Sequence, residues 1–192
     1  RENLITFRAP GRVNLIGEHT DYNAGFVMPA AINVSAYATI TPSEDREDRE
    51  DRKLRVRSDN FEDEVEIDLD DATLKARHHW SDYPVGVAVT LQRAGYHVRG
   101  GRLEIKSDVP MGSGLSSSAA VEVSTACALV AHWNLAIDRK ELALLCQRAE
   151  NEFVGARVGI MDQFVALFGE ERRALMLDCR SLEYKLLPVP SS

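Results

Sequence analysis

The sequence predicts an α+β fold in which a mixed sheet carries helices on one face. Apolar residues alternate with polar ones in residues 32–41 and 63–70, which is typical of half-buried strands. Apolar residues fall at helical spacing in the second half of the chain, which indicates helices that cover such a sheet. Between these segments, residues 101–107 resemble a strand that leads through a glycine loop into a further helix. At 192 residues the chain can bury one substantial core.

Composition narrows the class of protein. A net charge of −7 argues against nucleic-acid binding, and no apolar run approaches the ~20 residues that span a bilayer. Three cysteines, Cys127, Cys146 and Cys179, lie in apolar periodic segments and are predicted to be reduced core residues of a cytoplasmic protein. The chain starts at Arg1 without a methionine or a signal-peptide pattern, so we expect a trimmed start.

The first half of the chain is predicted to be mainly strands. A short strand over residues 4–7 leads into a polar loop, and the alternating residues 32–41 form the next strand. The charged tract SEDREDREDRK, residues 43–53, is predicted to be a solvated hairpin loop without function that joins this strand to residues 53–58. Residues 63–70 complete the run of strands.

The second half is predicted to be mainly helices. A helix over residues 80–95 starts at Ser81 or Asp82, and another starts near Ser117 or Ser118. Asp138 with Glu141 forms a capping box that opens a helix running to residue 155. Residues 159–170 form the last helix and 174–181 a strand, after which the chain runs out into an irregular tail.

The loop PMGSGLSSSAA, residues 110–120, predicts an anion site. Gly112 and Gly114 permit unusual backbone angles and close approach to a ligand, and the first turn of the following helix points N–H groups at it. The serine hydroxyls can bind phosphate oxygens or Mg²⁺, so the inferred ligand is a nucleoside triphosphate with Mg²⁺. The alternative is a simple serine cap on the helix. Walker A and dinucleotide motifs are both absent.

A second polar segment, residues 9–32, lacks any helical or strand period. Glu18, His19 and Asp21 can read the hydroxyls of a sugar, and Arg12 supplies a fixed positive charge. The alternative is that its glycines and asparagine are turn residues and its charges merely exposed.

Three motifs resemble one family. GLSSSA, residues 114–119, is similar to the phosphate loop of the GHMP small-molecule kinases, and GRVNLIGEHTDYN, residues 11–23, to the galactokinase signature. GIMDQ, residues 159–163, resembles a further galactokinase segment. Galactokinases usually carry Gly or Asp where this chain has Ala24. The resemblance implies a GHMP kinase N-terminal domain over residues 1–192, ribosomal protein S5 domain 2-like. The C-terminal domain, with its third glycine-rich motif, is absent, so we expect the chain alone to be inactive.

The resemblance also implies roles. The reaction would be ATP-dependent phosphorylation of α-D-galactose at O1, with Mg²⁺ as cofactor. The catalytic pair would be Asp162 and Arg12. Sugar contacts would come from Glu18, His19, Thr20, Asp21 and Gly159. The ATP phosphates would lie on Gly112, Ser113, Gly114, Leu115, Ser116, Ser117 and Ser118, with adenine near Trp80 and Tyr83, and Mg²⁺ on Ser118 and Glu150.

Other functions stay open at this point. A related sugar-1-kinase could act on N-acetylgalactosamine, galacturonate or arabinose on the same scaffold. A non-catalytic sensor of galactose and ATP would be expected to lose serines from the phosphate loop, and this loop is intact. A fragment without function of its own is the third alternative.

Overall fold

The computed structural model describes residues 4–17, 19–42 and 52–189. Within these ranges eight strands form one mixed sheet, which confirms the predicted fold class. The strands are β1 (Thr6–Asn14), β2 (Phe26–Val27), β3 (Pro29–Thr41), β4 (Lys53–Ser58), β5 (Asp63–Asp68), β6 (Gly101–Ser107), β7 (Arg173–Asp178) and β8 (Glu183–Pro188).

The strand order differs from the chain order. It runs β2-β7-β3-β6-β4-β5, with β1 paired to β3 and β8 to β7. Strands β4 and β6 are parallel, and the other described pairs are antiparallel. Because β6 lies between β3 and β4, these two strands are not neighbours and do not form the predicted hairpin, so that prediction was wrong. It rested on consecutive strands being neighbours, which a parallel crossover overrides. Residues 43–51 themselves lie outside the described part of the chain.

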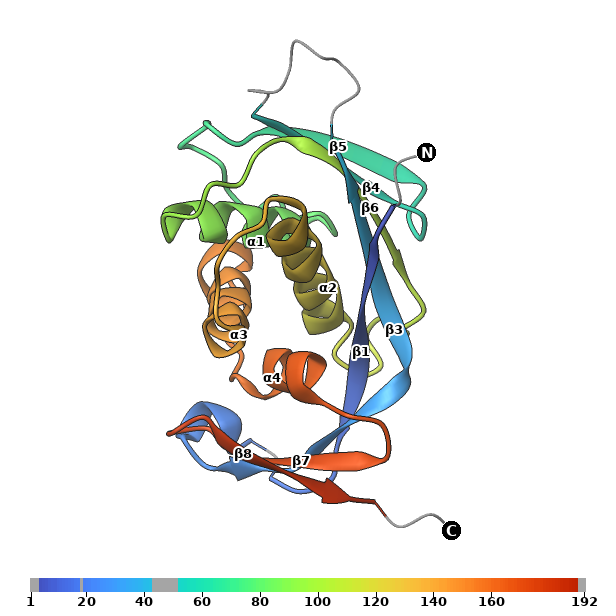
Figure 1. The fold of residues 1–192 in the computed structure, drawn as a ribbon, viewed down its shortest axis with the longest axis vertical. Helices are drawn as coiled ribbons and strands as arrows, with labels where there is room; N and C mark the ends of the chain where they lie inside the picture. Colours follow the sequence, from blue (N-terminus) through green and yellow to red (C-terminus); the bar gives the residue numbers. More distant parts are fainter. Residues whose placement is uncertain (1–3, 18, 43–51, 190–192) are drawn as a thin grey trace.

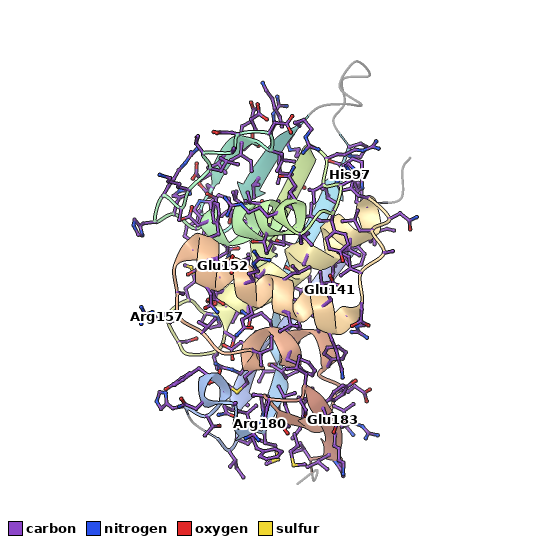
Figure 2. The ribbon with its side chains drawn as sticks, turned by 90° about the vertical axis from the view of Figure 1, so that its left-hand side faces the viewer. His97, Glu141, Glu152, Arg157, Arg180 and Glu183 are labelled. Carbon is purple, nitrogen blue, oxygen red and sulfur yellow. The ribbon has the colours of Figure 1, made fainter. Side chains whose placement is uncertain are left out.

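The helices pack against one face of this sheet, as predicted (Figure 1). They are α1 (Asp82–Arg93), α2 (Ser117–His132), α3 (Arg139–Arg148), the π-helical turn η3 (Ala149–Val154) and α4 (Met161–Phe168), with a short 3-10 turn η1 (Asp21–Asn23) in the polar loop. Figure 2 views the molecule from the helical side. The exposed residues Glu141 and Glu152 lie on α3 and η3, His97 and Arg157 lie in loops that flank the helices, and Arg180 and Glu183 lie at the turn between β7 and β8.

The core lies between the sheet and the helices. Its largest fully buried side chains include Leu54 and Leu103 from strands and Leu91, Leu129 and Phe164 from helices. All three cysteines are free, as predicted; Cys146 is buried, and Cys127 and Cys179 are half-buried. Among the helices of the described ranges, none combines the length and apolar character that a membrane span requires.

Three further element predictions need correction. The first strand was predicted over residues 4–7, but its pairing with β3 carries β1 on to Asn14, so the start of the polar segment is strand and not loop. The tail was expected to be irregular, but β8 pairs with β7 along its whole length, and Tyr184 from β8 packs against Phe164 and Phe168 with ring centroids 5.4 and 5.1 Å apart. The capping box forms only in part. Asp138 accepts hydrogen bonds from the amides of Lys140 and Glu141, but the Glu141 carboxylate accepts one from the Tyr96 hydroxyl instead of reaching back.

Candidate active site

The phosphate loop has the conformation that its glycines predict. Gly112 and Gly114 have φ values of 67° and 74°, and Ser116 also lies in the left-handed region with φ 60°. Three such residues curl the chain tightly before α2 begins at Ser117. The Ser116 side chain makes no capping hydrogen bond to α2, so the alternative of a simple serine cap at Ser116 is not supported. The amides of the first turn of α2 are left facing the loop with the positive end of the helix dipole behind them.

Strand β1 touches this loop directly. The pairing of β1 with β3 is irregular between Pro10 and Arg12, and at this irregularity the Arg12 amide donates to the carbonyl of Leu115 over 3.0 Å. A Cβ on Gly11 would lie 2.7 Å from the same carbonyl oxygen, so only glycine permits this approach. A strand irregularity of this kind redirects a side chain, and here it directs Arg12 into the site.

Arg12 joins three segments of the chain. Its Nε and Nη2 atoms donate to the two carboxylate oxygens of Asp162 over 2.7 and 2.8 Å, and its Nη1 donates to the carbonyl of Gly114 over 2.6 Å. The Ser116 hydroxyl also donates to Asp162, over 2.8 Å. Both charged side chains are largely shielded from solvent, at 15% and 21% exposure, where charge-assisted hydrogen bonds are strong. These hydrogen bonds, called here the Arg12–Asp162 fork, therefore fix Asp162 against the phosphate loop.

The polar loop lies beside the N-terminal end of α4. A Cβ on Gly159 would overlap the Asp21 carboxylate, so these two residues, both predicted sugar contacts, are in contact. His19 is exposed and adopts a positive φ of 61°. The Thr20 hydroxyl binds the carbonyls of Gly17 and Phe26, so it holds the loop together. Glu18 lies outside the described residues.

Two buried carboxylates lie behind the phosphate loop, in α2 and η3. Glu150 is 5% exposed and Glu122, from α2, is fully buried. Burial raises the pKa of Glu150, and a hydrogen bond from the Ser118 hydroxyl opposes that rise. Burial, followed by the nearby charge of Glu150, raises the pKa of Glu122 well above its ordinary value. The sequence placed Glu150 at the edge of a buried stripe, but α3 gives way to η3 here, and the widened turn sets the side chain inside.

A cavity of about 740 Å³ opens between the phosphate loop and α1. It is lined by Trp80 and Tyr83, which were predicted to lie near adenine, and by Gly112, Ser117 and Ser118 from the loop. A space of this size suits a nucleotide. The Trp80 indole donates to Asp63 over 3.0 Å and stacks on Phe61 at 5.6 Å with the rings 9° from parallel. Burial raises the pKa of the Tyr83 phenol.

Three residues of this region were missed by sequence reasoning: Phe61, Glu122 and Gln163. Phe61 sits in the turn between β4 and β5 and lines the cavity. No local pattern marks that turn as part of a site. The sequence did carry a signal for Glu122. It is a single acidic residue among apolar neighbours of a helix, a pattern that indicates a buried carboxyl with a hydrogen-bonding partner.

The donor set fits Mg²⁺ only together with a nucleotide. Within the described ranges no cluster of three or more His, Cys, Asp or Glu residues could hold a metal. Ser118 and Glu150 offer two hard oxygen donors that are hydrogen-bonded to each other. Mg²⁺ characteristically takes one or two protein oxygens and completes its shell with phosphate and water, so this pair fits.

Comparison with known proteins agrees with this arrangement. Residues 82–170 match the model of the GHMP kinases N terminal domain, and residues 1–42 match the galactokinase galactose-binding signature. A galactokinase of Chloroflexus aggregans is 48% identical over 184 residues, which is 96% of this chain and 46% of that protein. The chain thus spans about half the length of the curated relatives that it matches.

Solved structures agree with the sequence matches. The crystal structure of Lactococcus lactis galactokinase complexed with galactose superposes with a TM-score of 0.90 at 41% identity, over 98% of this chain and 48% of that one. Methanococcus jannaschii mevalonate kinase has the same fold, with a TM-score of 0.79 at 17% identity over 100% of this chain and 57% of that one. The chain is thus similar to the N-terminal region of the GHMP kinases. Among these proteins, the sequence and structure matches indicate the N-terminal region of the galactokinases.

Proposed function

We propose that this chain is the N-terminal domain, residues 1–192, of a galactokinase whose C-terminal domain completes the active site. The complete protein transfers the γ-phosphoryl group of ATP to O1 of α-D-galactose. Relatives named galactokinase and a solved relative with bound galactose support this assignment. The galactose-binding signature over residues 1–42 supports the choice of sugar.

The Arg12–Asp162 fork is the observation that carries the proposal. It joins the sugar signature, the phosphate loop and α4, so a sugar hydroxyl and a γ-phosphate held by these segments would meet beside one carboxylate. Positioning of this kind is most of what phosphoryl transfer requires of a protein.

The residues then divide the work. Oxygen O1 forms a bond to the γ-phosphorus while the bond from that phosphorus to the leaving oxygen of ADP breaks, and the O1 proton passes to Asp162. Arg12 orients Asp162 and stabilises the charge that develops beside it. His19 and Asp21 in the described loop, together with Glu18 and the backbone at Gly159, orient the sugar, and Thr20 holds that loop in shape. The loop amides and hydroxyls of residues 112–118 bind the ATP phosphates, and Trp80 and Tyr83 flank adenine.

Ser118 and Glu150 are the protein oxygens that would hold Mg²⁺. The ion, when bound, neutralises charge on the phosphates. In the proposed division of work, Ser118 serves both the phosphate loop and the metal, because it lies in the first turn of α2, where the loop passes into the helix.

The test is a substrate panel with the complete protein, ATP and Mg²⁺. Phosphorus NMR should detect galactose 1-phosphate from galactose and much less product from N-acetylgalactosamine, galacturonate or arabinose. Turnover of one of those sugars with galactose untouched would assign a different sugar-1-kinase. Binding of galactose and ATP without any turnover would assign a sensor. Calorimetry on the 192-residue chain alone should detect weak ligand binding, with little or no turnover.

A further inference from the structure

A buried amide bridges two buried carboxylates behind the phosphate loop. Gln163 is fully buried, and its Nε2 atom donates to Glu150 Oε2 over 2.7 Å and to Glu122 Oε2 over 3.0 Å. A glutamine amide has two N–H donors, so it can satisfy both carboxylates at once. Nothing in the proposed chemistry uses Gln163 or Glu122 directly.

These side chains connect three helical segments. Glu122 lies four residues after Ser118 on α2, so both occupy one face of that helix. The Gln163 amide in α4 donates to Glu150 in η3 and to Glu122 in α2, and the Ser118 hydroxyl opposes the rise in the pKa of Glu150 that burial causes. No lysine or arginine of the described ranges forms an ion pair with Glu150 or Glu122. Among the side chains of the described ranges, Gln163 therefore makes the short, well-defined hydrogen bond that orients the Glu150 carboxylate.

We propose that Gln163 is a positioning residue for the magnesium site, and that Glu122 holds Gln163 in place. Gln163 binds the Oε2 oxygen of Glu150 and thereby turns the other oxygen toward Ser118 and the metal. This inference rests on the proposed function, in which Ser118 and Glu150 hold Mg²⁺. Residues that orient a metal ligand typically change metal affinity 10- to 100-fold when they are lost.

The geometry also couples the metal to the sugar side. Gln163 follows Asp162 in the first turn of α4, and successive helical residues point roughly 100° apart. Asp162 is held by Arg12 and Ser116, whereas Gln163 is held by the two buried carboxylates. The first turn of α4 thus positions both Asp162, beside the sugar hydroxyl that is to be phosphorylated, and Gln163, which supports the metal ligand Glu150.

Calorimetric binding of a non-hydrolysable ATP analogue to the complete protein, at a series of Mg²⁺ concentrations, tests the proposal. Gln163→Met and Glu122→Met keep the side-chain volume and remove the hydrogen bond. Both should raise the Mg²⁺ concentration for half-saturation about tenfold or more. Glu122→Gln still offers an acceptor oxygen to Gln163 and should stay within about threefold of the wild type. Galactose affinity, measured without metal, should change by less than about twofold.

Ser124→Ala is the matched control, because Ser124 is fully buried on the same helix and bonds only within it, to the Val121 carbonyl. It should leave both affinities unchanged. If the methionine variants give no cooperative melt, Gln163→Asn decides instead, since its shorter side chain cannot reach both carboxylates and should produce the same shift in Mg²⁺ dependence.

Three results would overturn the proposal: an unchanged Mg²⁺ dependence in a folded Gln163 variant, equal defects in Glu122→Gln and Glu122→Met, or a parallel loss of metal and galactose affinity. The wild-type measurements distinguish failure of this proposal about Gln163 from failure of the proposed function. A wild-type protein that binds the analogue with Mg²⁺ but leaves galactose unphosphorylated refutes the function, while the variants still report on the metal site.

Discussion

Gly159→Ala tests the contact between Asp21 of the polar loop and the backbone just before α4. A Cβ at this position would overlap the Asp21 carboxylate and lie 2.8 Å from the Asp21 Cβ, closer than real Cβ contacts come. Asp21 must therefore move. Overpacking of this kind costs about 1–3 kcal/mol. Gly159 does not have a positive φ, so alanine adds no backbone strain, and the whole cost comes from the collision.

The cost should appear in two measurements. The free energy of unfolding should fall by about 1–3 kcal/mol, and galactose should bind at least about fivefold more weakly, because Asp21 is displaced from its proposed place at the sugar. Binding of the ATP analogue with Mg²⁺ should change little, because the phosphate loop is not touched.

A double-mutant cycle identifies the partner. In an Asp21→Ala background the two nearest colliding atoms are absent, so the added methyl group should destabilise the protein by about 1 kcal/mol less than in the wild type. An equal loss of stability in both backgrounds would refute the reasoning, as would a Gly159→Ala protein with native stability and native galactose affinity.

Three further predictions concern other parts of the site. Arg12→Lys replaces a planar guanidinium that makes three hydrogen bonds by an ammonium group that cannot bind both Asp162 oxygens and the Gly114 carbonyl at once, and it should lower kcat at least about 100-fold. A kcat within tenfold of the wild type would contradict the role of this arginine. Burial raises the pKa of Glu122 in the folded protein, so the metal-free wild type loses stability as pH rises above the pKa of the unfolded chain. Glu122→Gln has no carboxyl to ionise at this position and should escape that loss. In thermal melts the variant should match the wild type near pH 4 and become more stable than the wild type between about pH 5 and 7, by up to about 1.4 kcal/mol per pH unit. A constant difference across this range would exclude a raised pKa. Ala24→Gly relieves a left-handed φ of 53° at an exposed site and should stabilise the fold by about 0.5–1 kcal/mol in a denaturant titration, with sugar binding unchanged.

The parts of the site that local chemistry determines could be predicted from the sequence. Gly112 and Gly114 predicted the curled loop, because few other residues adopt those backbone angles, and α2 begins where the serines indicated. The charged stretch around Arg12 was identified as part of a site because no regular period explained its polar residues. In the structure the residue lies near the end of β1, at the irregularity in the pairing with β3.

The remaining features depend on contacts between segments far apart in the chain. The insertion of β6 between β3 and β4 follows from a parallel crossover that no local pattern encodes. β8 was missed because its proline and serine neighbours indicate a tail, yet β7 offered it an open edge. Gln163 looked like a helix residue beside a catalytic aspartate, and only the packing of α4 on α2 and η3 brings it to Glu122 and Glu150.

The positions of Asp162 and Gln163 in this site depend on how firmly α4 is packed against its neighbours. The helix has only eight residues, too short to be stable on its own. Phe164 is fully buried and stacks on Phe168 at 4.5 Å, and Tyr184 of β8 packs against both rings. The strand that the sequence did not reveal therefore supports the helix that carries Asp162 and Gln163. Because a side chain displaced by about 1 Å can cost two orders of magnitude in rate, packing on the far side of α4 belongs to the active site as much as the motifs do.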